Sequence, residues 1–306
     1  MADITAGAMP LATPKALESD ADLLPVKVRS YWQTVAFRLR HDPVTLVFAA
    51  IILLIIASAV FAPWLAPKDP LATSMINRLK PIGHPGFPLG TDEMGRDILS
   101  RLMWGGRSSL LMGLVPVALA MVIGGALGVV AGFVGGTVNM LIMRVMDVFY
   151  AFPSILLAVA ISGAMGGGML NGMLSLTVVF IAPMCRVAET ATTQVRGLDF
   201  VEAARASGAS TLSIIVTHIL GNVLAPVFVY ASGMVSVSIL LASGLSFLGL
   251  GVAPPTPDWG LMLSTLRQAI YINPVVCALP GVAILITSLS FNLVSDGLRQ
   301  AMDVKM

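Results

Sequence analysis

Of the 306 residues, 57% are hydrophobic and only 11% are charged, and the mean hydropathy is +0.90. Because soluble domains carry roughly 25% charged residues, this composition excludes a soluble catalytic domain and predicts an all-α, polytopic membrane protein. The net charge of +2 is too small to favour nucleic-acid binding. The two cysteines, Cys185 and Cys277, have neither metal-site nor disulfide spacing.

The N-terminal segment, residues 1–43, is polar and basic. Residues 1–24 are expected to be disordered, whereas 26–41 read as an amphipathic helix lying at the membrane interface. The first apolar run is too long for the core of a cleavable signal peptide. Basic residues before a first span favour a cytoplasmic N-terminus; here they are Lys15, Lys27, Arg29, Arg38 and Arg40.

Six apolar runs follow, each close to the roughly 20 residues that a spanning helix needs. Six spans return the C-terminus to the cytoplasmic side, and lysine and arginine are modestly more numerous in the segments placed there. The membrane-spanning region is thus 44–306, with an external connection at 67–107, a cytoplasmic loop at 191–221 and an external Pro-rich loop at 251–272. The predicted spans are 44–65, 108–132, 140–162, 170–190, 224–248 and 275–295.

The polar segment 191–221 carries two helix-capping patterns between apolar runs. Asp199 is predicted to cap a short helix, and Glu202 three residues later to reach back to it. Gly208 suits the left-handed turn that ends a helix, and Ser210 suits the N-cap of a second helix. The residues predicted to meet another protein are Asp199, Glu202, Ala203, Ala204, Arg205, Gly208, Ala209 and Ser210.

This segment resembles the EAA loop of ABC importer permeases, in which Glu-Ala-Ala is followed three residues later by Gly. Gly221 stands where that family usually has proline, which leaves the angle of the second helix open. Four further motifs resemble the second permease of the dipeptide/oligopeptide/nickel importers. They are Leu-Gly-Thr-Asp-Glu-Met-Gly-Arg-Asp at 89–97, Ala-Phe-Pro-Ser at 151–154, Leu-Ser-Phe-Leu-Gly-Leu-Gly at 245–251 and Asp-Gly-Leu-Arg at 296–299.

The resemblance implies a type I ABC importer permease fold in a bacterial inner membrane. It implies a non-catalytic subunit that pairs with a homologous second permease and rests on two cytoplasmic ATPases, which bind ATP and Mg. A substrate-binding protein outside the membrane would deliver the solute. The chain lacks a phosphate-binding loop of the P-loop type, so it is not itself the ATPase. Di- or oligopeptides are the expected solutes; nickel chelates, opines and glutathione are alternatives. No cofactor or metal is expected on this chain.

Charged and glycine residues elsewhere suggest further roles. Arg144 and Asp147, at i and i+3, are predicted to form a structural ion pair, with a gate or path element as the alternative. Glycines in the second span predict close helix packing, at the seam between two permeases. The external motif is either a salt-bridged loop or a gate or binding-protein contact; its residues are Gly90, Thr91, Asp92, Gly95, Arg96 and Asp97.

Two other classes of polytopic membrane protein would show different sequence patterns. An ATP-independent secondary transporter would favour inverted repeats and broken helices, and the sequence indicates neither, so continuous spans are expected. A membrane-embedded enzyme would need a nucleophile with a base, or a set of metal ligands, inside the spans. The histidines, His41, His84 and His218, all lie outside the span centres.

Overall fold

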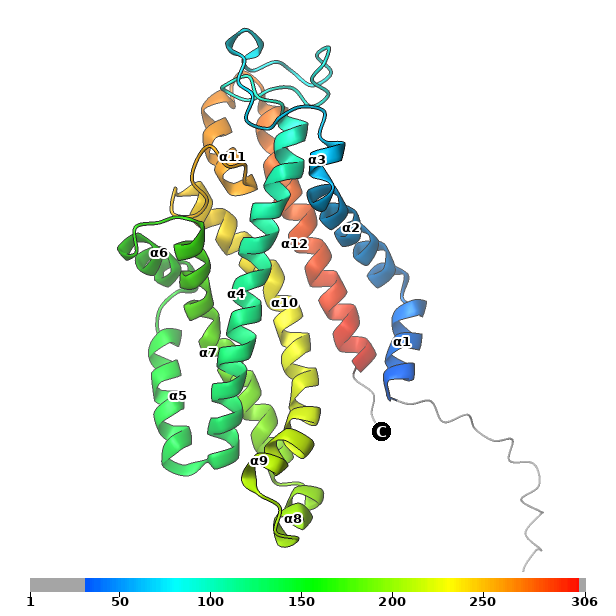
Figure 1. Cartoon of the computed structure of the whole chain (residues 1–306), viewed down its shortest axis with the longest axis vertical. Helices are drawn as coiled ribbons and strands as arrows, with labels where there is room; N and C mark the ends of the chain where they lie inside the picture. The colour runs from blue at the N-terminus through cyan, green and yellow to red at the C-terminus, as the bar shows by residue number, and fades with distance from the viewer. Residues whose placement is uncertain (1–30, 303–306) are drawn as a thin grey trace, which may run out of the picture.

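The computed structural model describes residues 31–302, and its regular secondary structure there is entirely helical. Five helical segments are long and apolar enough to cross a membrane, and a sixth span results if one bent pair of helices is counted as one. The predicted all-α fold with up to six spans is therefore confirmed (Figure 1). The five are α2 (Pro43–Val60), α4 (Ile98–Val134), α7 (Met169–Arg196), the continuous run Thr211–Phe247 and α12 (Pro274–Met302).

The first described helix, α1 (Tyr31–His41), lies within the predicted interfacial segment 26–41. Residues 1–30, including the segment predicted to be disordered, lie outside the described residues. Arg38 donates a hydrogen bond to the carbonyl of Gln300 at 3.4 Å, which holds α1 against the end of α12. Asp42 then caps α2 by accepting from the backbone N–H of Val44 at 3.1 Å.

Helix α4 begins at Ile98, ten residues before the predicted start of the second span. Asp97 caps it by accepting from the backbone N–H of Ser100 at 2.8 Å. The predicted start at residue 108 was wrong because the charged residues before it were excluded from the span. Within the fold, these charged side chains have hydrogen-bond or ion-pair partners. Arg107 donates to the carbonyls of Ala59 and Val60 at 2.6 and 2.7 Å. Helix α4 therefore includes residues 98–107 of the connection predicted at 67–107.

The predicted continuous span 140–162 is broken. Helices α5 (Gly136–Tyr150) and α6 (Ser154–Ala164) meet at an angle of 90° across residues 151–153. Pro153 explains the break, because a proline removes a helical N–H and disfavours helical geometry in the residue before it. The expectation of unbroken helices was therefore wrong at this position.

A stripe of glycines on α4 packs against α7. A Cβ on Gly124, Gly128 or Gly132 would lie 2.6, 2.3 or 2.7 Å from a backbone carbonyl oxygen of α7, so only glycine permits this approach. A Cβ on Gly125, in contrast, would meet nothing within 4 Å. The close packing is confirmed, but its predicted place is wrong, since this seam joins two helices of one chain.

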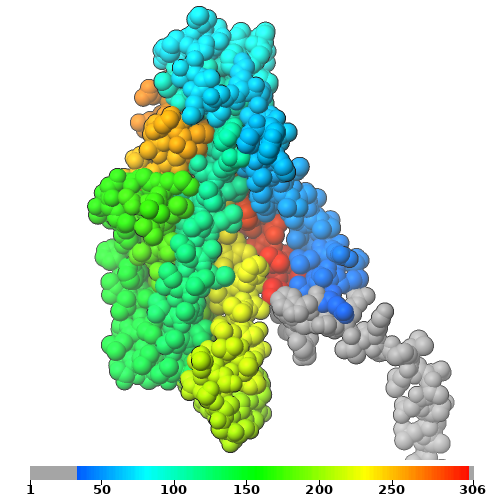
Figure 2. All heavy atoms as spheres, in the orientation of Figure 1, coloured from blue at the N-terminus to red at the C-terminus, as the bar shows by residue number. Residues whose placement is uncertain are grey.

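The two ends of the bundle differ in character. The connection between α3 (Ala62–Leu65) and α4 lies at the upper end, together with α11 (Trp259–Leu266) (Figure 1). Helices α8 (Asp199–Ala206) and α9 (Thr211–Ile214) lie at the opposite end, beyond α1 and the end of α12. In the space-filling view they form a knob that extends below the helical body (Figure 2).

Candidate functional site

The knob begins with α8, whose start differs from the prediction. Leu198 occupies the N-cap position, and no side chain there accepts a hydrogen bond. The capping box predicted for Asp199 and Glu202 is therefore wrong. Both carboxylates instead lie in the first turn of α8, where they interact favourably with the exposed backbone N–H groups of the helix end.

The turn after α8 forms as predicted. Gly208 has φ of +80°, a left-handed conformation that suits glycine, and its N–H donates to the carbonyl of Arg205 at 3.0 Å. Ser210 is the N-cap of α9 and accepts from the backbone N–H of Ser213 at 3.3 Å. The chain is thus redirected between two helices by local hydrogen bonds alone.

One face of α8 is seated on the helical body and the other is exposed. Val201 is fully buried, and the guanidinium of Arg205 lies 5.3 Å from the ring centroid of Phe133 in α4. Glu202 and Ala203 face outward, and Ala209 and Ser210 in the turn are exposed as well. Val201 shares a buried apolar cluster with Val129, Phe133, Ala188, Ile214, Ile219, Val223 and Val227.

The second helix of the knob continues directly into the fifth span. Helix α9 passes through a π-helical turn, Ile215–Ile219, into α10 (Leu220–Phe247). The second helix and the span predicted at 224–248 are therefore one continuous helical run, Thr211–Phe247. Gly221, in the place of the usual proline, lies inside this continuous helix. π-Helical turns are rare and are frequently found at functional positions.

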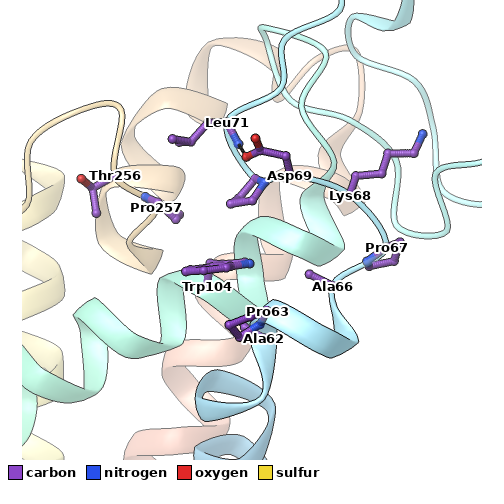
Figure 3. Close-up of a pocket in the computed structure, with 11 residues that line it drawn as sticks. Ala62, Pro63, Ala66, Pro67, Lys68, Asp69, Leu71, Trp104, Thr256 and Pro257 are labelled. Carbon is purple, nitrogen blue, oxygen red and sulfur yellow. Dashed lines mark hydrogen bonds between the residues drawn. The ribbon is translucent and has the colours of Figure 1, made fainter.

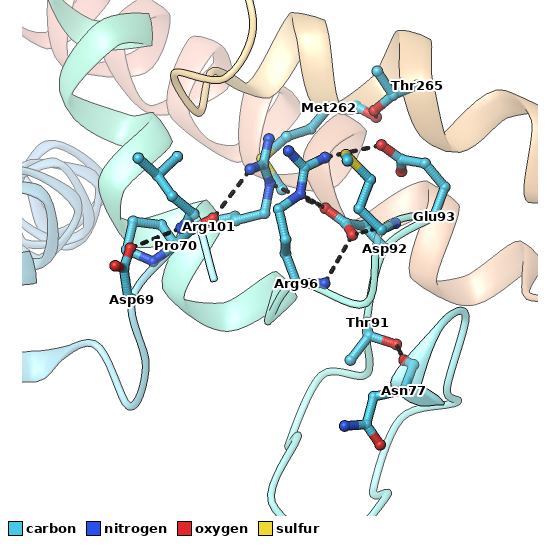
Figure 4. A network of polar contacts seen from close by, with 12 residues as sticks. Asp69, Pro70, Asn77, Thr91, Asp92, Glu93, Arg96, Arg101, Met262 and Thr265 are labelled. Atoms are coloured by element: carbon cyan, nitrogen blue, oxygen red, sulfur yellow. Dashed lines mark hydrogen bonds and ion pairs between the residues drawn. The ribbon is translucent and has the colours of Figure 1, made fainter. Parts of the chain in front are cut away.

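The external motif forms a compact buried network (Figure 4). One oxygen of Asp92 lies 2.6 Å from Nε of Arg96 and 3.3 Å from Nε of Arg101. Arg96 also contacts Glu93 at 2.9 Å. The carboxylate of Asp92 and both guanidinium groups are buried. These ions pair with one another rather than face a partner, which favours the structural interpretation of the motif.

The backbone of this motif is equally constrained. Gly90 and Gly95 have φ of +80° and +73°, and a Cβ on Gly95 would collide with the carbonyl of Ser74. Thr91 donates to the carbonyl of Asn77, and Asp97 caps α4. Each residue of the motif therefore has a conformational or hydrogen-bonding role within the external segment.

The ion pair predicted within α5 is weak. Arg144 and Asp147 approach only to 3.9 Å, and 79% of the Arg144 side chain is exposed. Asp147 makes a closer contact, at 2.6 Å, with Arg186 of α7. The guanidinium of Arg186 also stacks 4.5 Å above the ring of Tyr150. Sequence reasoning missed Arg186 because its partners lie on another helix.

The start of α11 is locked onto α4 by Asp258. Its Oδ1 accepts from the backbone N–H of Leu261 at 3.0 Å, and its Oδ2 accepts from the hydroxyl of Ser109 at 2.7 Å. The hydroxyl oxygen of Ser109 in turn accepts from the N–H of Trp259 at 3.1 Å. Burial raises the pKa of Asp258, although these hydrogen bonds oppose the shift.

A cavity of about 670 Å³ opens near the outer end of α4 (Figure 3). Trp104 and several prolines form its walls. The ammonium of Lys68 lies over the ring of Phe87, and Asp69 accepts from the N–H of Leu71 at 2.8 Å. Its charged side chains are thus already engaged. Within residues 31–302, no group of three or more potential metal ligands occurs.

Long apolar helices, a bent pair at 151–153 and a short helical knob between two spans define a polytopic membrane protein. Its fold is similar to that of a chain in the structure titled "Inward facing conformations of the MetNI methionine ABC transporter", a type I ABC importer. The TM-score is 0.54 at 21% identity, covering 65% of this chain and 95% of that one. Residues 124–306 match the family described as binding-protein-dependent transport system inner membrane component, and the chain belongs to that family. Residues 30–81 match the N-terminal transmembrane domain of oligopeptide transport permease C.

Three curated relatives cover most of the chain. The di/tripeptide transport system permease protein of Pseudomonas aeruginosa is 42% identical over 94% of this chain and 96% of its own length. The probable D,D-dipeptide transport system permease protein of Escherichia coli is 40% identical, with 89% and 91% covered. The glutathione transport system permease protein of Pectobacterium atrosepticum is 39% identical, with 91% and 93% covered. The chain is therefore an inner-membrane permease.

Proposed function

We propose that this chain forms half of the path by which an ATP-driven importer moves di- or tripeptides and similar solutes across the inner membrane. The observation that carries the proposal is the knob formed by α8 and α9. Its inner face is seated on α4 and α7 through Val201, whereas Glu202 and Ala203 remain exposed. A second protein bound to this surface would contact α8 and α9, which are directly connected to the spans α7 and α10.

The partner that suits the knob is a cytoplasmic ATPase. Two such subunits would bind ATP and Mg, whereas this chain would bind no cofactor and catalyse no reaction. A homologous permease would complete the path, giving a heterodimer, and an external binding protein would deliver solute. Under this assignment the knob and both termini face the cytoplasm, and the segment 67–97 faces outward. Coupling requires that the two conformations of the permease bind the ATPases differently.

Short peptides are the favoured solutes because the relatives' names refer to dipeptides and tripeptides. Glutathione is itself a peptide, and one relative is named for its transport. Opines and nickel chelates are alternatives that would use the same machinery. All of them carry carboxylate groups together with amine or amide nitrogen, or a metal ion bound by such groups, so one path could carry each.

A secondary transporter is the competing class, and the break between α5 and α6 is the feature that favours it. Interrupted helices line solute sites in many transporters of that kind. The knob, however, has no use in a transporter that works without a cytoplasmic partner. ATP-independent uptake by the purified chain alone would support that alternative.

The test uses the whole complex, reconstituted in liposomes with its permease, ATPase and binding-protein partners. Glu202→Lys reverses one exposed charge of α8 and should reduce ATP-driven uptake of alanyl-alanine by about tenfold or more, because like charges at an interface cost several kcal/mol. ATP hydrolysis should persist without transport. Asp296→Lys makes the same charge change on an exposed residue of α12 and should transport normally. Normal uptake by the Glu202 variant would overturn the coupling proposal.

A further inference from the structure

A pocket of about 280 Å³ lies at the break between α5 and α6. Four helices contribute to it, so segments far apart in the sequence meet around one small space. Residues from the end of α5, the break and the start of α6 form one side, and α7 and α10 form the others. The lining residues used below are Phe149, Tyr150, Phe152, Phe180, Tyr230 and Met234.

Charged side chains stand beside this pocket. Arg186 stacks on Tyr150, which lines the pocket, and pairs with Asp147 at 2.6 Å. The side chains of Asp147 and Arg186 are 46% and 45% exposed, although both belong to segments apolar enough to span a membrane. Charges within spans are costly towards lipid and usually face a protein interior or a water-filled path. This face of the chain is therefore unsuited to hydrocarbon.

The chemistry of the pocket matches a short zwitterionic peptide. Asp147 and Arg186 flank the pocket without lining it, and they pair with each other at 2.6 Å. A bound peptide would separate this pair, its ammonium group meeting Asp147 and its carboxylate meeting the planar guanidinium of Arg186, which suits two parallel hydrogen bonds. The hydroxyls of Tyr150 and Tyr230 can donate to or accept from a peptide bond. Aromatic rings and Met234 offer apolar walls that adapt to different side chains, because methionine is flexible and polarizable.

We propose that this pocket is a peptide half-site on the translocation path, a deduction that rests on the function proposed above. Its volume is close to the lower limit of ligand pockets, about 300 Å³, which suits half of a site that a second permease completes. The opposite charges of Asp147 and Arg186 orient the peptide termini, and the apolar walls tolerate varied side chains. The site thus recognises the backbone termini of a short peptide rather than its sequence.

The first test is protection of an introduced thiol in the complete, reconstituted transporter. Both native cysteines, Cys185 and Cys277, are buried and provide an unreactive background. Val237 lines the pocket and is 38% exposed, so Val237→Cys should react with a methanethiosulfonate reagent. At a peptide concentration about four times its Kd, about one fifth of the sites remain free. Alanyl-alanine and ATP should therefore slow the reaction of this thiol by about fivefold.

Phe228→Cys provides the matched control. Phe228 lies on the same helix, is 51% exposed and lines a separate apolar cavity between α2, α4, α10 and α12. Peptide should leave its reaction rate unchanged. If wild-type complex transports alanyl-alanine but peptide protects neither thiol, or both equally, the half-site is overturned and the proposed function stands. Absence of uptake by the wild-type complex would overturn both.

The second test distinguishes recognition from structural support. Tyr230→Phe removes one hydroxyl and should raise the KM for alanyl-alanine about fivefold, the effect of one hydrogen bond. The double variant Asp147→Arg with Arg186→Asp keeps an ion pair but exchanges the positions of its charges. Because the peptide termini would then face like charges, its KM for alanyl-alanine should also be higher than that of wild type. A wild-type KM in both variants would show that these groups only support the fold and would overturn their assignment to the path.

Discussion

Ser109 in α4 and Asp258 at the start of α11 are joined by a hydrogen bond of 2.7 Å, although 149 residues separate them in the chain. Both side chains are buried, and the same serine oxygen accepts from the N–H of Trp259. A single hydroxyl therefore satisfies an acid and a backbone donor at once. This contact fixes the N-terminal part of α4 to the short helix that precedes the last span.

Removal of that hydroxyl is expected to destabilise the protein. Ser109→Ala leaves one oxygen of buried Asp258 and one backbone N–H unpaired, at a cost of about 1–3 kcal/mol for each group left unsatisfied. Thermal unfolding of the purified chain in detergent should show a lower midpoint. The neighbouring Ser108→Ala, which breaks no hydrogen bond to Asp258, should shift the midpoint much less. Equal shifts would contradict this role.

Asp258 also predicts a pH dependence of stability. Burial raises its pKa in the folded chain above the ordinary value of about 3.9, so the folded state binds this proton more tightly than the unfolded state. The stability that this group contributes is therefore fully present below the unfolded pKa and is lost as pH rises through the folded pKa. The unfolding temperature of wild type, compared with that of Asp258→Asn, should fall over this range. A constant difference at all pH values would refute the prediction.

The glycine seam offers a matched pair of substitutions. Gly128→Ala places a methyl group 2.3 Å from the carbonyl oxygen of Cys185, so α4 and α7 must move apart, at about 1–3 kcal/mol. Gly125→Ala points into open space and should be neutral or stabilising by up to about 1 kcal/mol, because alanine favours helix. Unfolding midpoints in detergent would compare them. The seam would not require glycine if both variants behaved alike.

The external network should respond unequally to the loss of its two acids. Asp92→Asn leaves buried Arg96 and Arg101 undercompensated and should cost about 3–5 kcal/mol. Glu93 is less buried and makes one contact, with Arg96, so Glu93→Gln should cost no more than about 1 kcal/mol. Chemical unfolding would measure both. A larger effect from Glu93 would reverse the roles assigned to the two acids.

The apolar runs sufficed to predict the spanning helices, since hydropathy reports directly on burial in lipid. They failed where charge is neutralised by the fold. Arg101 can lie within α4 because it pairs with Asp92, and Arg107 can because it donates to two backbone carbonyls of α2. A hydropathy window along the sequence does not include these partners. The break at 151–153 was missed for the opposite reason, because apolar composition continues across it.

The knob was predicted in outline from local signals. Gly208 and Ser210 act through neighbours within three residues, so their roles could be read from the sequence. The seat of Val201 and the partner of Asp147 depend on α4 and α7, whose positions emerge only in the folded chain. The same limitation applies to the pocket at the break, which requires four helices to meet.

The unbroken run Thr211–Phe247 has a mechanical consequence. At 1.5 Å per residue it forms a rod about 55 Å long. It carries the knob at one end and packs against α11 near the other. A tilt of only about 5° would displace its far end by about 5 Å, a length comparable to one helical turn. Under the proposed coupling, a small tilt produced at the knob would become a larger displacement at the opposite end of the bundle, without any segment of the helix unfolding.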